Sequence, residues 1–247
     1  MTERAVIFGR DAESYDRHRP EYPPEAIDHL VSLVEVTRAV EVGAGTGKAT
    51  VGVAREGIEL ICVEPSVEMA RLLAAKSLPG VEVVVSTLED WEPAATGVDL
   101  VYAAQAWHWV DGDTAYAKVR SMLRPGGALA LMWNIPTARF TQFEDVYRRH
   151  APGLLDEADE RIRKRDAHDW LEEMGSAGFS QLSLFTHSWS RRLVPGDFRS
   201  LCATYSDHMM LEDAVRERLL EALESEATAR GVPVIVEYRT DVFSGTT

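Results

Sequence analysis

The order of apolar segments in this chain of 247 residues predicts an α/β fold, in which helices cover both faces of a mostly parallel sheet. Short apolar runs typical of buried strands alternate with segments whose apolar residues recur every three to four positions, as on one face of a helix. Three glycines at alternate positions follow the first predicted strand, which is typical of a strand that turns sharply into a helix beside a ligand.

The first half of the chain is predicted to contain five strands and three helices, the first helix preceding all of the strands. This first helix spans 23–34, because its apolar residues fall on one face. Short apolar runs, each bounded by turn residues or a helical segment, then mark the strands. We predict strands at 39–42, 60–63, 81–85, 98–103 and 128–133, and helices at 48–55 and 67–73.

The second half continues with helices and two longer strands. The apolar period is helical within 136–175, and the glycines at 175 and 178 offer stops. Residues 182–193 and 232–242 are predicted as strands, the latter because apolar residues alternate along it. Between these strands, 212–230 is predicted as a helix whose apolar residues recur every four positions. No linker, repeat or low-complexity segment divides the chain, so we expect a single domain over 1–247.

The turn after the first strand carries the strongest local signal. Gly43, Gly45 and Gly47 give the spacing G-x-G-x-G, and Glu41 lies within the preceding strand. Because glycine has no Cβ, a ligand can lie directly against the backbone N–H groups of this turn. Lys48 stands where the dinucleotide fingerprint G-x-G-x-x-G has its last glycine, and this departure disfavours NAD.

The second strand ends in a carboxylate that suits a ribose. Residues 60–63 are fully apolar, and Glu64 follows them about twenty residues after the first glycine of the turn. A carboxylate in this position can accept hydrogen bonds from both hydroxyls of a ribose. Pro65 and Ser66 then end the strand, and an amphipathic helix follows. The two features together predict a nucleoside-binding site.

Four ordered motifs and an N-terminal pattern identify a resemblance. They are Val-Glu-Val-Gly-Ala-Gly-Thr-Gly at 40–47, Val-Glu-Pro-Ser at 63–66, Ala-Gln-Ala-Trp-His-Trp at 104–109, Leu-Arg-Pro-Gly-Gly at 123–127, and Phe8, Tyr15, Arg19-Pro20 and Tyr22-Pro23. With them the chain resembles the class I S-adenosylmethionine (SAM)-dependent methyltransferases. Within that class it is similar to the methyltransferase type 11 group and to trans-aconitate methyltransferase-like small-molecule enzymes. The match covers residues 8 to about 135.

The resemblance implies a Rossmann-like, seven-stranded, mostly parallel sheet with helices on both faces and a reversed C-terminal β-hairpin. It implies a division of the domain into a lid and first helix at 1–36, a cofactor-binding core at 37–135, and substrate-side helices and C-terminal strands at 136–247. In relatives the N-terminal segment folds over the cofactor, with the arginine and a tyrosine near the methionine carboxylate of SAM.

The resemblance also implies which residues bind SAM. They are Tyr15, Arg19, Glu41, Gly43, Ala44, Gly45, Gly47, Glu64, Pro65, Met69, Thr87, Leu88, Glu89 and Gln105. The adenine contact after the third strand falls to Thr87, Glu89 or Asp90, because many relatives have Asp at the Thr87 position. For Asp90 the alternative is a helix or turn cap.

The segment after the fourth strand is expected to line the substrate side of the pocket, together with Tyr22. Trp107 and Trp109 offer apolar, electron-rich faces that attract the cationic sulfonium of SAM. His108 is the candidate general base for a protonated acceptor, and a packed structural histidine is the alternative.

The expected reaction is in-line displacement of the methyl group by an O, N or C nucleophile, for which alignment is the main contribution of the protein. A carboxylate acceptor needs no base. In that case Arg139, Arg191, Arg192 or Arg199 is a candidate to hold a second acidic group, with a solvated surface role as the alternative for each.

Composition excludes several classes of partner and site. The formal net charge of −14 disfavours a nucleic-acid substrate, and the basic residues at 161–165 are interleaved with acids. No run of eighteen apolar residues predicts a membrane span. Cys62 and Cys202 are expected to be reduced thiols, which favours the cytoplasm, and no metal site is predicted.

Three functions from different classes explain parts of these observations. A SAM-dependent small-molecule methyltransferase explains all four motifs together. A non-catalytic SAM-binding regulator explains the cofactor motifs equally well. An NAD-dependent oxidoreductase explains the first two glycines and Glu64, but neither Gly47 followed by Lys48 nor the Trp-His-Trp segment. The oligomeric state is not predicted.

Overall fold

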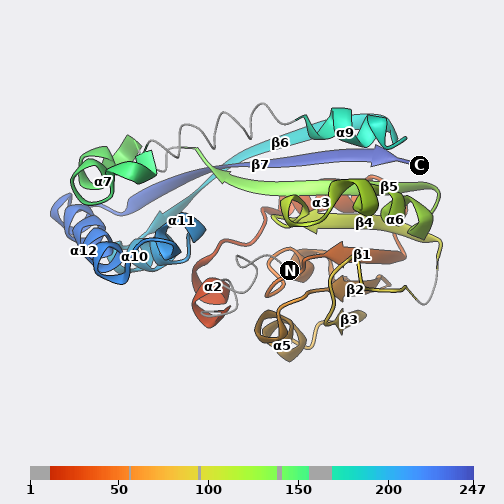
Figure 1. The fold of residues 1–247 in the computed structure, drawn as a ribbon, viewed down its shortest axis with the longest axis horizontal. Helices are drawn as coiled ribbons and strands as arrows, with labels where there is room; N and C mark the ends of the chain where they lie inside the picture. Colours follow the sequence, from red (N-terminus) through yellow and green to blue (C-terminus); the bar gives the residue numbers. More distant parts are fainter. Residues whose placement is uncertain (1–11, 56, 94–95, 138–140, 156–168) are drawn as a thin grey trace.

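The computed structural model describes residues 12–55, 57–93, 96–137, 141–155 and 169–247. Within them, seven strands form one sheet in the order β3-β2-β1-β4-β5-β7-β6 (Figure 1). The strands are β1 (Arg38–Val42), β2 (Glu59–Val63), β3 (Val81–Val84), β4 (Val98–Ala104), β5 (Leu123–Pro136), β6 (Ser180–Leu193) and β7 (Val234–Thr246). The first five strands run parallel, and β7 is antiparallel to both β5 and β6. The predicted fold class, with its reversed C-terminal hairpin, is therefore confirmed.

Helices cover both faces of this sheet. One face carries α3 (Pro24–Ser32), α4 (Thr50–Val53) and α5 (Val67–Ala75). The opposite face carries α6 (Gly112–Met122) and α9 (Trp170–Ser176).

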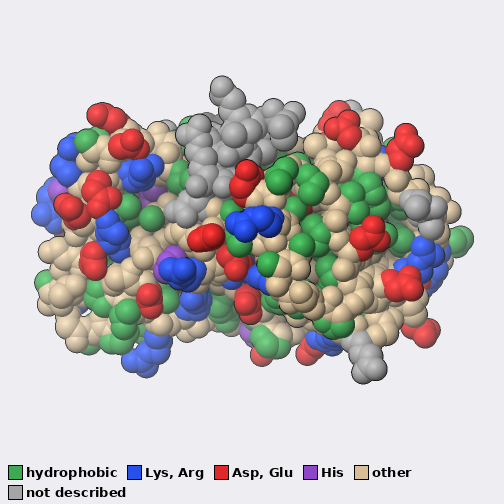
Figure 2. Space-filling view, turned by 90° about the horizontal axis from the view of Figure 1, so that it is seen from below, with side chains coloured by type: hydrophobic (Ala, Val, Ile, Leu, Met, Phe, Trp, Pro, Cys, Tyr) green, Lys and Arg blue, Asp and Glu red, His purple; other side chains and the backbone are tan. Residues whose placement is uncertain are grey.

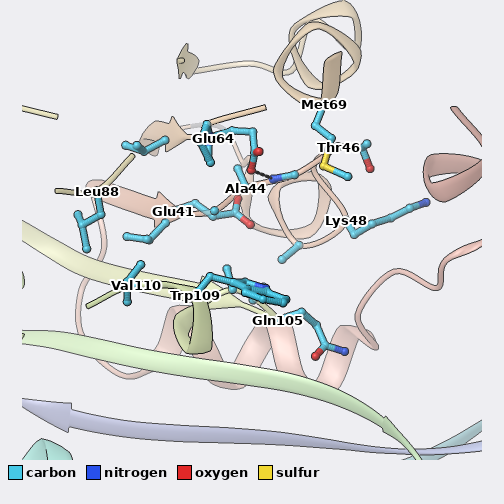
Figure 3. A pocket seen from close by; sticks show the side chains of 18 of the residues that line it. Glu41, Ala44, Thr46, Lys48, Glu64, Met69, Leu88, Gln105, Trp109 and Val110 are labelled. Carbon is cyan, nitrogen blue, oxygen red and sulfur yellow. Dashed lines mark hydrogen bonds between the residues drawn. The ribbon is translucent and has the colours of Figure 1, made fainter. Parts of the chain in front are cut away.

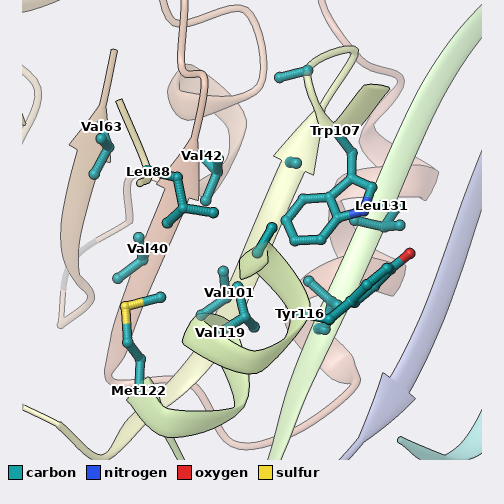
Figure 4. Close-up of a cluster of buried hydrophobic side chains, with 14 of the residues drawn as sticks. Val40, Val42, Val63, Leu88, Val101, Trp107, Tyr116, Val119, Met122 and Leu131 are labelled. Carbon is teal, nitrogen blue, oxygen red and sulfur yellow. The ribbon is translucent and has the colours of Figure 1, made fainter. Parts of the chain in front are cut away.

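Alternation along the central strands separates two hydrophobic cores. In β4, Leu100 and Tyr102 pack on the α3 side, whereas Val101 packs on the α6 side, because successive side chains of a strand point to opposite faces. Figure 4 shows the α6 side, where Trp107 and Tyr116 lie beside the apolar side chains of β1, β4 and β5. Full burial of a large apolar side chain contributes about 1.5–3 kcal/mol, so these positions fix which face each strand presents.

Asp99 connects the starts of three neighbouring strands, β1, β4 and β5. Its Oδ2 accepts hydrogen bonds of 2.9 Å from the N–H groups of Thr37 and Arg38, and its Oδ1 accepts one of 2.5 Å from Arg124 Nε. Burial raises the pKa of Asp99, but these hydrogen bonds together hold it well below its usual value. The ionised carboxylate thus joins β4 to the start of β1 and to β5.

A third hydrophobic core lies at one end of the molecule, in a group of helices that we call the helical lobe. The helices are α7 (Glu144–His150), α10 (Pro195–Ala203), α11 (Ser206–Met209) and α12 (Asp213–Ala229). β6 and β7 reach into the lobe, where Leu193, Val234 and Tyr238 join its core. Figure 1 shows the lobe to the left of the sheet, at the end of these two long strands.

Several elements differ from their predicted extents. The helix predicted at 48–55 shortens to α4, where Gly52 allows α3 to approach closely. The helical segment predicted within 136–175 is divided among a short 3₁₀ turn at Thr141–Phe143, α7 and α9. Helices α2 (Ala12–His18), α6, α10 and α11 were not predicted. Helices α2 and α11 have only 7 and 4 residues, whereas α6 and α10 bury apolar faces that include Val119 and Phe198. Phe8 and Arg139 lie outside the described residues.

The surface carries charges of both signs. Acidic and basic side chains are interspersed over the face shown in Figure 2. In the described part of the chain, no helix is both long and apolar enough to cross a membrane. The same residues contain no group of three or more His, Cys, Asp or Glu side chains that could hold a metal ion.

Candidate functional site

A cavity of about 670 Å³ lies at the carboxyl ends of the parallel strands (Figure 3). Its walls come from the turn after β1, the ends of β2, β4 and β5, the segment after β3, residues 15–22, and two tyrosines of the helical lobe and β7. In sheets of this kind, ligands bind at the point where the strand order reverses, which here falls between β1 and β4. The volume is within the range of about 300–1,000 Å³ that is typical of small-molecule sites.

The turn after β1 depends on glycine for close contacts as well as for its conformation. Gly43 has φ +67°, and a Cβ there would lie 2.4 Å from the Cβ of Ala106. Gly47 has φ +90°, and a Cβ there would lie 2.4 Å from Leu73 Cδ1. Gly43, Ala44 and Gly45 line the cavity, whereas Gly47 serves the packing of α5 behind it.

Glu64 joins this turn to the end of β2. The N–H of Gly45 donates to Oε2 at 2.7 Å, shown by the dashed line in Figure 3, and the N–H of Ser66 donates to Oε1 at 2.8 Å. Burial raises the pKa of Glu64, and these two N–H groups oppose the rise. A carboxylate has about four lone-pair sites, so Glu64 retains the capacity to accept hydrogen bonds from ribose hydroxyls at the cavity wall.

Glu41 lies deeper, beneath the glycine turn. Its Oε2 accepts hydrogen bonds from Thr50 Oγ1 at 2.5 Å and from the Tyr102 hydroxyl at 2.8 Å, with Cys62 Sγ at 3.8 Å. Burial raises its pKa to about 7, and the hydrogen bonds from Thr50 and Tyr102 oppose the rise. Glu41 therefore supports the turn from below while also lining the cavity.

The segment after β3 forms one wall, and its side chains are already engaged. The Thr87 hydroxyl donates to Asp90 Oδ2 at 2.9 Å and accepts from the Asp90 N–H at 3.1 Å. Glu89 Oε1 accepts from the Asp111 N–H at 3.1 Å. All three line the cavity with Leu88, and the reciprocal Thr87–Asp90 pair matches the turn-cap alternative for Asp90. Pro65 and Met69 line the cavity from the β2 side.

The end of β4 is held in an uncommon backbone conformation. Gln105 has φ +59°, and its N–H donates to Met132 O at 2.9 Å. Its side-chain amide donates to Asn134 O at 2.8 Å. These contacts with β5 hold Gln105 against the cavity, next to the glycine turn (Figure 3).

The Trp-His-Trp segment is a single 3₁₀ turn, Trp107–Trp109, and its members diverge. Trp109 lines the cavity, as predicted for a wall residue. Trp107 does not: it is 2% exposed and packs in the α6 core, with its ring centroid 5.0 Å from that of Tyr116 (Figure 4). Residues in such a turn point in directions about 120° apart, so neighbours cannot share one wall. His108 is exposed and does not line the cavity, so its catalytic role stays a prediction without supporting geometry.

The N-terminal residues cross the cavity and are fixed by contacts from three sides. Arg19 Nη2 donates to Thr204 O at 2.8 Å, and Arg191 Nη1 donates to His18 O at 3.0 Å. Asn134 Nδ2 donates to Glu21 O at 3.2 Å. Tyr15, Arg19 and Tyr22 consequently line the cavity, and their roles toward cofactor and acceptor stay predictions.

Several wall residues were not predicted. Among them are Thr46, Lys48, Ser86, Val110, Asp111, Asn134, Pro136, Tyr205 and Tyr238. Lys48 and Thr46 could have been found, because they belong to the glycine motif. Tyr205 and Tyr238 had no local signal, since their position depends on the lobe and on the pairing of β7 with β5. The arginines suggested for a second acidic group, Arg191, Arg192 and Arg199, do not line the cavity.

Residues 40–131 match the family described as a methyltransferase domain. An uncharacterized methyltransferase of Mycobacterium tuberculosis is 42% identical over 130 residues, which cover 53% of each chain. A trans-aconitate 2-methyltransferase of Azoarcus sp. is 33% identical over 126 residues, 49% of each chain. A methyltransferase-like protein of Schizosaccharomyces pombe is 28% identical over 89% of this chain and 85% of its own. The chain thus spans about half the length of the first curated relatives that it matches.

Solved structures share the fold. A protein of Anaeromyxobacter dehalogenans, assigned as a type II methyltransferase, superposes with a TM-score of 0.63 at 24% identity, over 92% of this chain and 97% of its own. A phosphoethanolamine N-methyltransferase of Haemonchus contortus, solved with S-adenosylhomocysteine (SAH), has a TM-score of 0.55 at 12% identity, over 100% of this chain and 60% of its own. At these identities the likeness concerns the fold alone.

Proposed function

Since residues 40–131 of this chain match the family described as a methyltransferase domain, we propose that the protein transfers a methyl group from SAM to an O, N or C nucleophile of a small molecule. The proposal rests on the hydrogen bond that joins Gly45 of the glycine turn to Glu64, at the wall of a cavity of about 670 Å³. We further propose that 1–247 acts as one domain, with the acceptor bound toward 136–247.

The polar and aromatic groups at the cavity wall suit the parts of SAM. Glu64 would accept from the ribose, and the segment from Thr87 to Asp90 would face the adenine. The glycine turn brings backbone close to the methionine part, and Trp109 offers an aromatic face to a sulfonium. Acidic groups gather on this side of the cavity: Glu41, Glu64, Glu89 and Asp90.

When bound, SAM supplies a methyl group on a positively charged sulfur, which is a good leaving group. The residues of this chain have to bind, align and exclude water. Gln105 and Trp109 stand at the end of β4, between the cofactor side and the acceptor side, where they would limit the approach of the acceptor to one line. The N-terminal residues cover the cavity and would reduce the access of water.

The acceptor class is open between two chemistries that the relatives represent. The name of the Azoarcus relative states trans-aconitate, a carboxylate, and the Haemonchus enzyme is named for an amine. A carboxylate acceptor needs no general base, which accords with the position of His108 outside the cavity wall. We therefore favour an acceptor that is nucleophilic without help from His108.

Two alternatives remain as competing proposals. A SAM-binding regulator would use the same cofactor residues without turnover. An NAD-dependent oxidoreductase is disfavoured, because Gly47 serves the packing of α5 and Lys48 occupies the site of the last fingerprint glycine. Cytoplasmic location is proposed from Cys62 and Cys202, which are buried free thiols.

Calorimetric titration of the purified protein and of Glu64→Ala with SAM, SAH and NAD tests the proposal. We expect micromolar binding of SAM and SAH to the parent protein and no binding of NAD. Glu64→Ala should bind SAH at least 100-fold more weakly, because it loses two hydrogen bonds to the ribose together with the hydrogen bond from the Gly45 N–H that holds the glycine turn. His108→Ala serves as the matched variant and is expected to bind SAH like the parent. NAD binding, or equal SAH affinity in parent and Glu64→Ala, would refute the assignment.

A further inference from the structure

Three polar groups of residues at the cavity wall lack a hydrogen-bond partner among the described residues. They are Arg19 Nε, the Tyr22 hydroxyl and the Tyr238 hydroxyl, and each atom is buried with no partner of suitable distance and angle among the described residues. Tyr22 is 8% exposed and Tyr238 is 3% exposed. All three residues line the cavity. A buried polar group without a partner costs free energy, so such groups at a cavity wall indicate a ligand that would satisfy them.

Arg19 is held rigidly beside both hydroxyls. Its Nη2 is fixed by Thr204 O, and its guanidinium lies over the Tyr205 ring, 4.6 Å from the centroid. Burial raises the pKa of Tyr22 and of Tyr238, and the positive charge of Arg19 opposes the rise at both hydroxyls. Tyr205 further raises the pKa of Tyr238 without completing a hydrogen bond to it. Both phenols therefore stay protonated and can act as donors.

Donors of this kind suit an anion and disfavour a cation. A guanidinium has only N–H donors, and two protonated phenols beside it add two O–H donors. An ammonium group placed here would meet the fixed charge of Arg19, and Arg191 adds a second positive charge near Tyr238. Glu41 is the acidic wall residue whose charge acts on Tyr22 and raises its pKa, whereas Arg19 opposes this rise at Tyr22 and also acts on Tyr238. Oxyanions accept such charge-assisted hydrogen bonds at short distance.

The position of Tyr238 points to the acceptor as the source of the anion. Tyr238 pairs with Pro136 at the end of β5, and four strand spacings separate β7 from β2, which carries Glu64. At about 4.8 Å per spacing this is roughly 19 Å, well beyond β4, where the methyl group is expected. The methionine carboxylate of the cofactor is thus the less suitable occupant.

We propose that Arg19, Tyr22 and Tyr238 form an anion subsite, which binds a carboxylate-type oxyanion of the methyl acceptor and so selects anionic over cationic acceptors. The inference rests on the proposed methyltransferase function. It assigns acceptor recognition to Arg19 and the two phenols, in place of the arginines of β6 and α10.

The test uses Tyr238→Phe, which removes only the hydroxyl, with Tyr147→Phe in α7 as the matched control outside the cavity. Protein saturated with SAH is titrated with succinate against succinamide and with benzoate against benzamide, pairs that differ mainly in charge. We expect each carboxylate to bind at least tenfold more tightly than its amide. Tyr238→Phe and Arg19→Lys should each reduce this preference about tenfold, whereas Tyr147→Phe should retain it.

A second arm separates the acceptor from the cofactor as the source of the anion. Parent and Tyr238→Phe are titrated with SAH and with methylthioadenosine, which lacks the amino-acid carboxylate. Unchanged SAH affinity in Tyr238→Phe, with an unchanged or higher melting temperature, supports the subsite, because the lost hydroxyl had no partner. Weaker binding of SAH alone would assign the site to the cofactor and overturn the proposal. Equal binding, or no binding, of carboxylate and amide would also overturn it. Failure of the parent to bind SAH would instead refute the proposed function.

Discussion

Glu41 is a buried carboxyl that lies beneath the glycine turn and links neighbouring elements of the site. Its carboxyl is 1% exposed, and its Oε2 accepts from Thr50 and Tyr102, which belong to α4 and β4. A buried carboxyl with neutral donors is more stable protonated, which is why its pKa rises to about 7. The contribution of Glu41 to the stability of the fold therefore depends on pH near neutrality. Glu41 lies two positions before the first glycine of the turn.

Glu41→Gln should remove this dependence. Because the folded-state pKa is raised above the ordinary value of 4.5, the stabilising contribution of Glu41 is fully present below pH 4.5 and is lost as the pH rises toward 7. Ionisation of the buried group costs about 3 kcal/mol above pH 7. We expect the stability of Glu41→Gln, relative to the parent, to increase by about 2–3 kcal/mol between pH 5 and pH 8, as measured by urea unfolding at both values. Parallel pH dependence in the two proteins would contradict the assignment.

At the scale of elements, the glycine turn joins strands that are distant in the sequence. Gly43 accommodates Ala106 from the end of β4, and Gly45 donates to Glu64 from the end of β2. The site is therefore assembled from three neighbouring strand ends, and any change in the turn is transmitted to both neighbours.

Gly43→Ala tests whether the close contact with Ala106, and not the positive φ alone, requires glycine at this position. The added Cβ would lie 2.4 Å from Ala106 Cβ, so we expect a destabilisation of about 2–4 kcal/mol and at least tenfold weaker SAH binding. Gly231→Ala is the matched control, because Gly231 has φ +68° and no heavy atom within 4 Å of the added Cβ. The control should lose about 1–2 kcal/mol and keep SAH affinity. Equal effects of the two substitutions would mean that conformation alone accounts for the loss.

The same scale explains what the sequence could and could not predict. Strands β1, β2 and β4 are apolar runs, so their burial and the residues at their ends followed from local pattern. The divergence of Trp107 and Trp109 depended on a 3₁₀ turn that leaves no signal in hydrophobicity. Asn134 and Tyr238 reached the cavity through the pairing of β5 with β7, about one hundred residues apart, which local periodicity does not encode.

At the scale of the whole molecule, the N-terminal residues connect the sheet with the helical lobe. Arg19 binds Thr204 at the end of α10, and Asn134 of β5 binds Glu21. Asp16 accepts from Lys76 Nζ at 2.8 Å, which ties α2 to the end of α5. The cavity is thus bordered by the N-terminal segment, the ends of several strands and Tyr205 of the lobe, and a ligand in it would contact both the sheet and the lobe.

Binding of SAH should therefore stabilise the molecule as one unit. At an SAH concentration one hundred times its dissociation constant, we expect about 2.7 kcal/mol of stabilisation and a rise in melting temperature of roughly 5–10 °C. Hydrogen exchange should slow at the amides of β4 and also at those of α12, although α12 does not line the cavity. Slower exchange in β4 with unchanged exchange in α12 would show that the lobe unfolds independently.

The connection between β6 and β7 has one further consequence. Helices α10, α11 and α12 all lie between Leu193 and Val234, and these two residues face each other in the antiparallel register. The entry and exit of this segment are thus one strand spacing apart, about 4.8 Å, which is the separation that a short hairpin loop bridges. The segment supplies Tyr205 to the wall of the cavity, but none of the residues around Glu64. Helices α10, α11 and α12 therefore form one insertion between two paired strand ends, and its replacement would change the wall around Tyr205 without rebuilding the sheet.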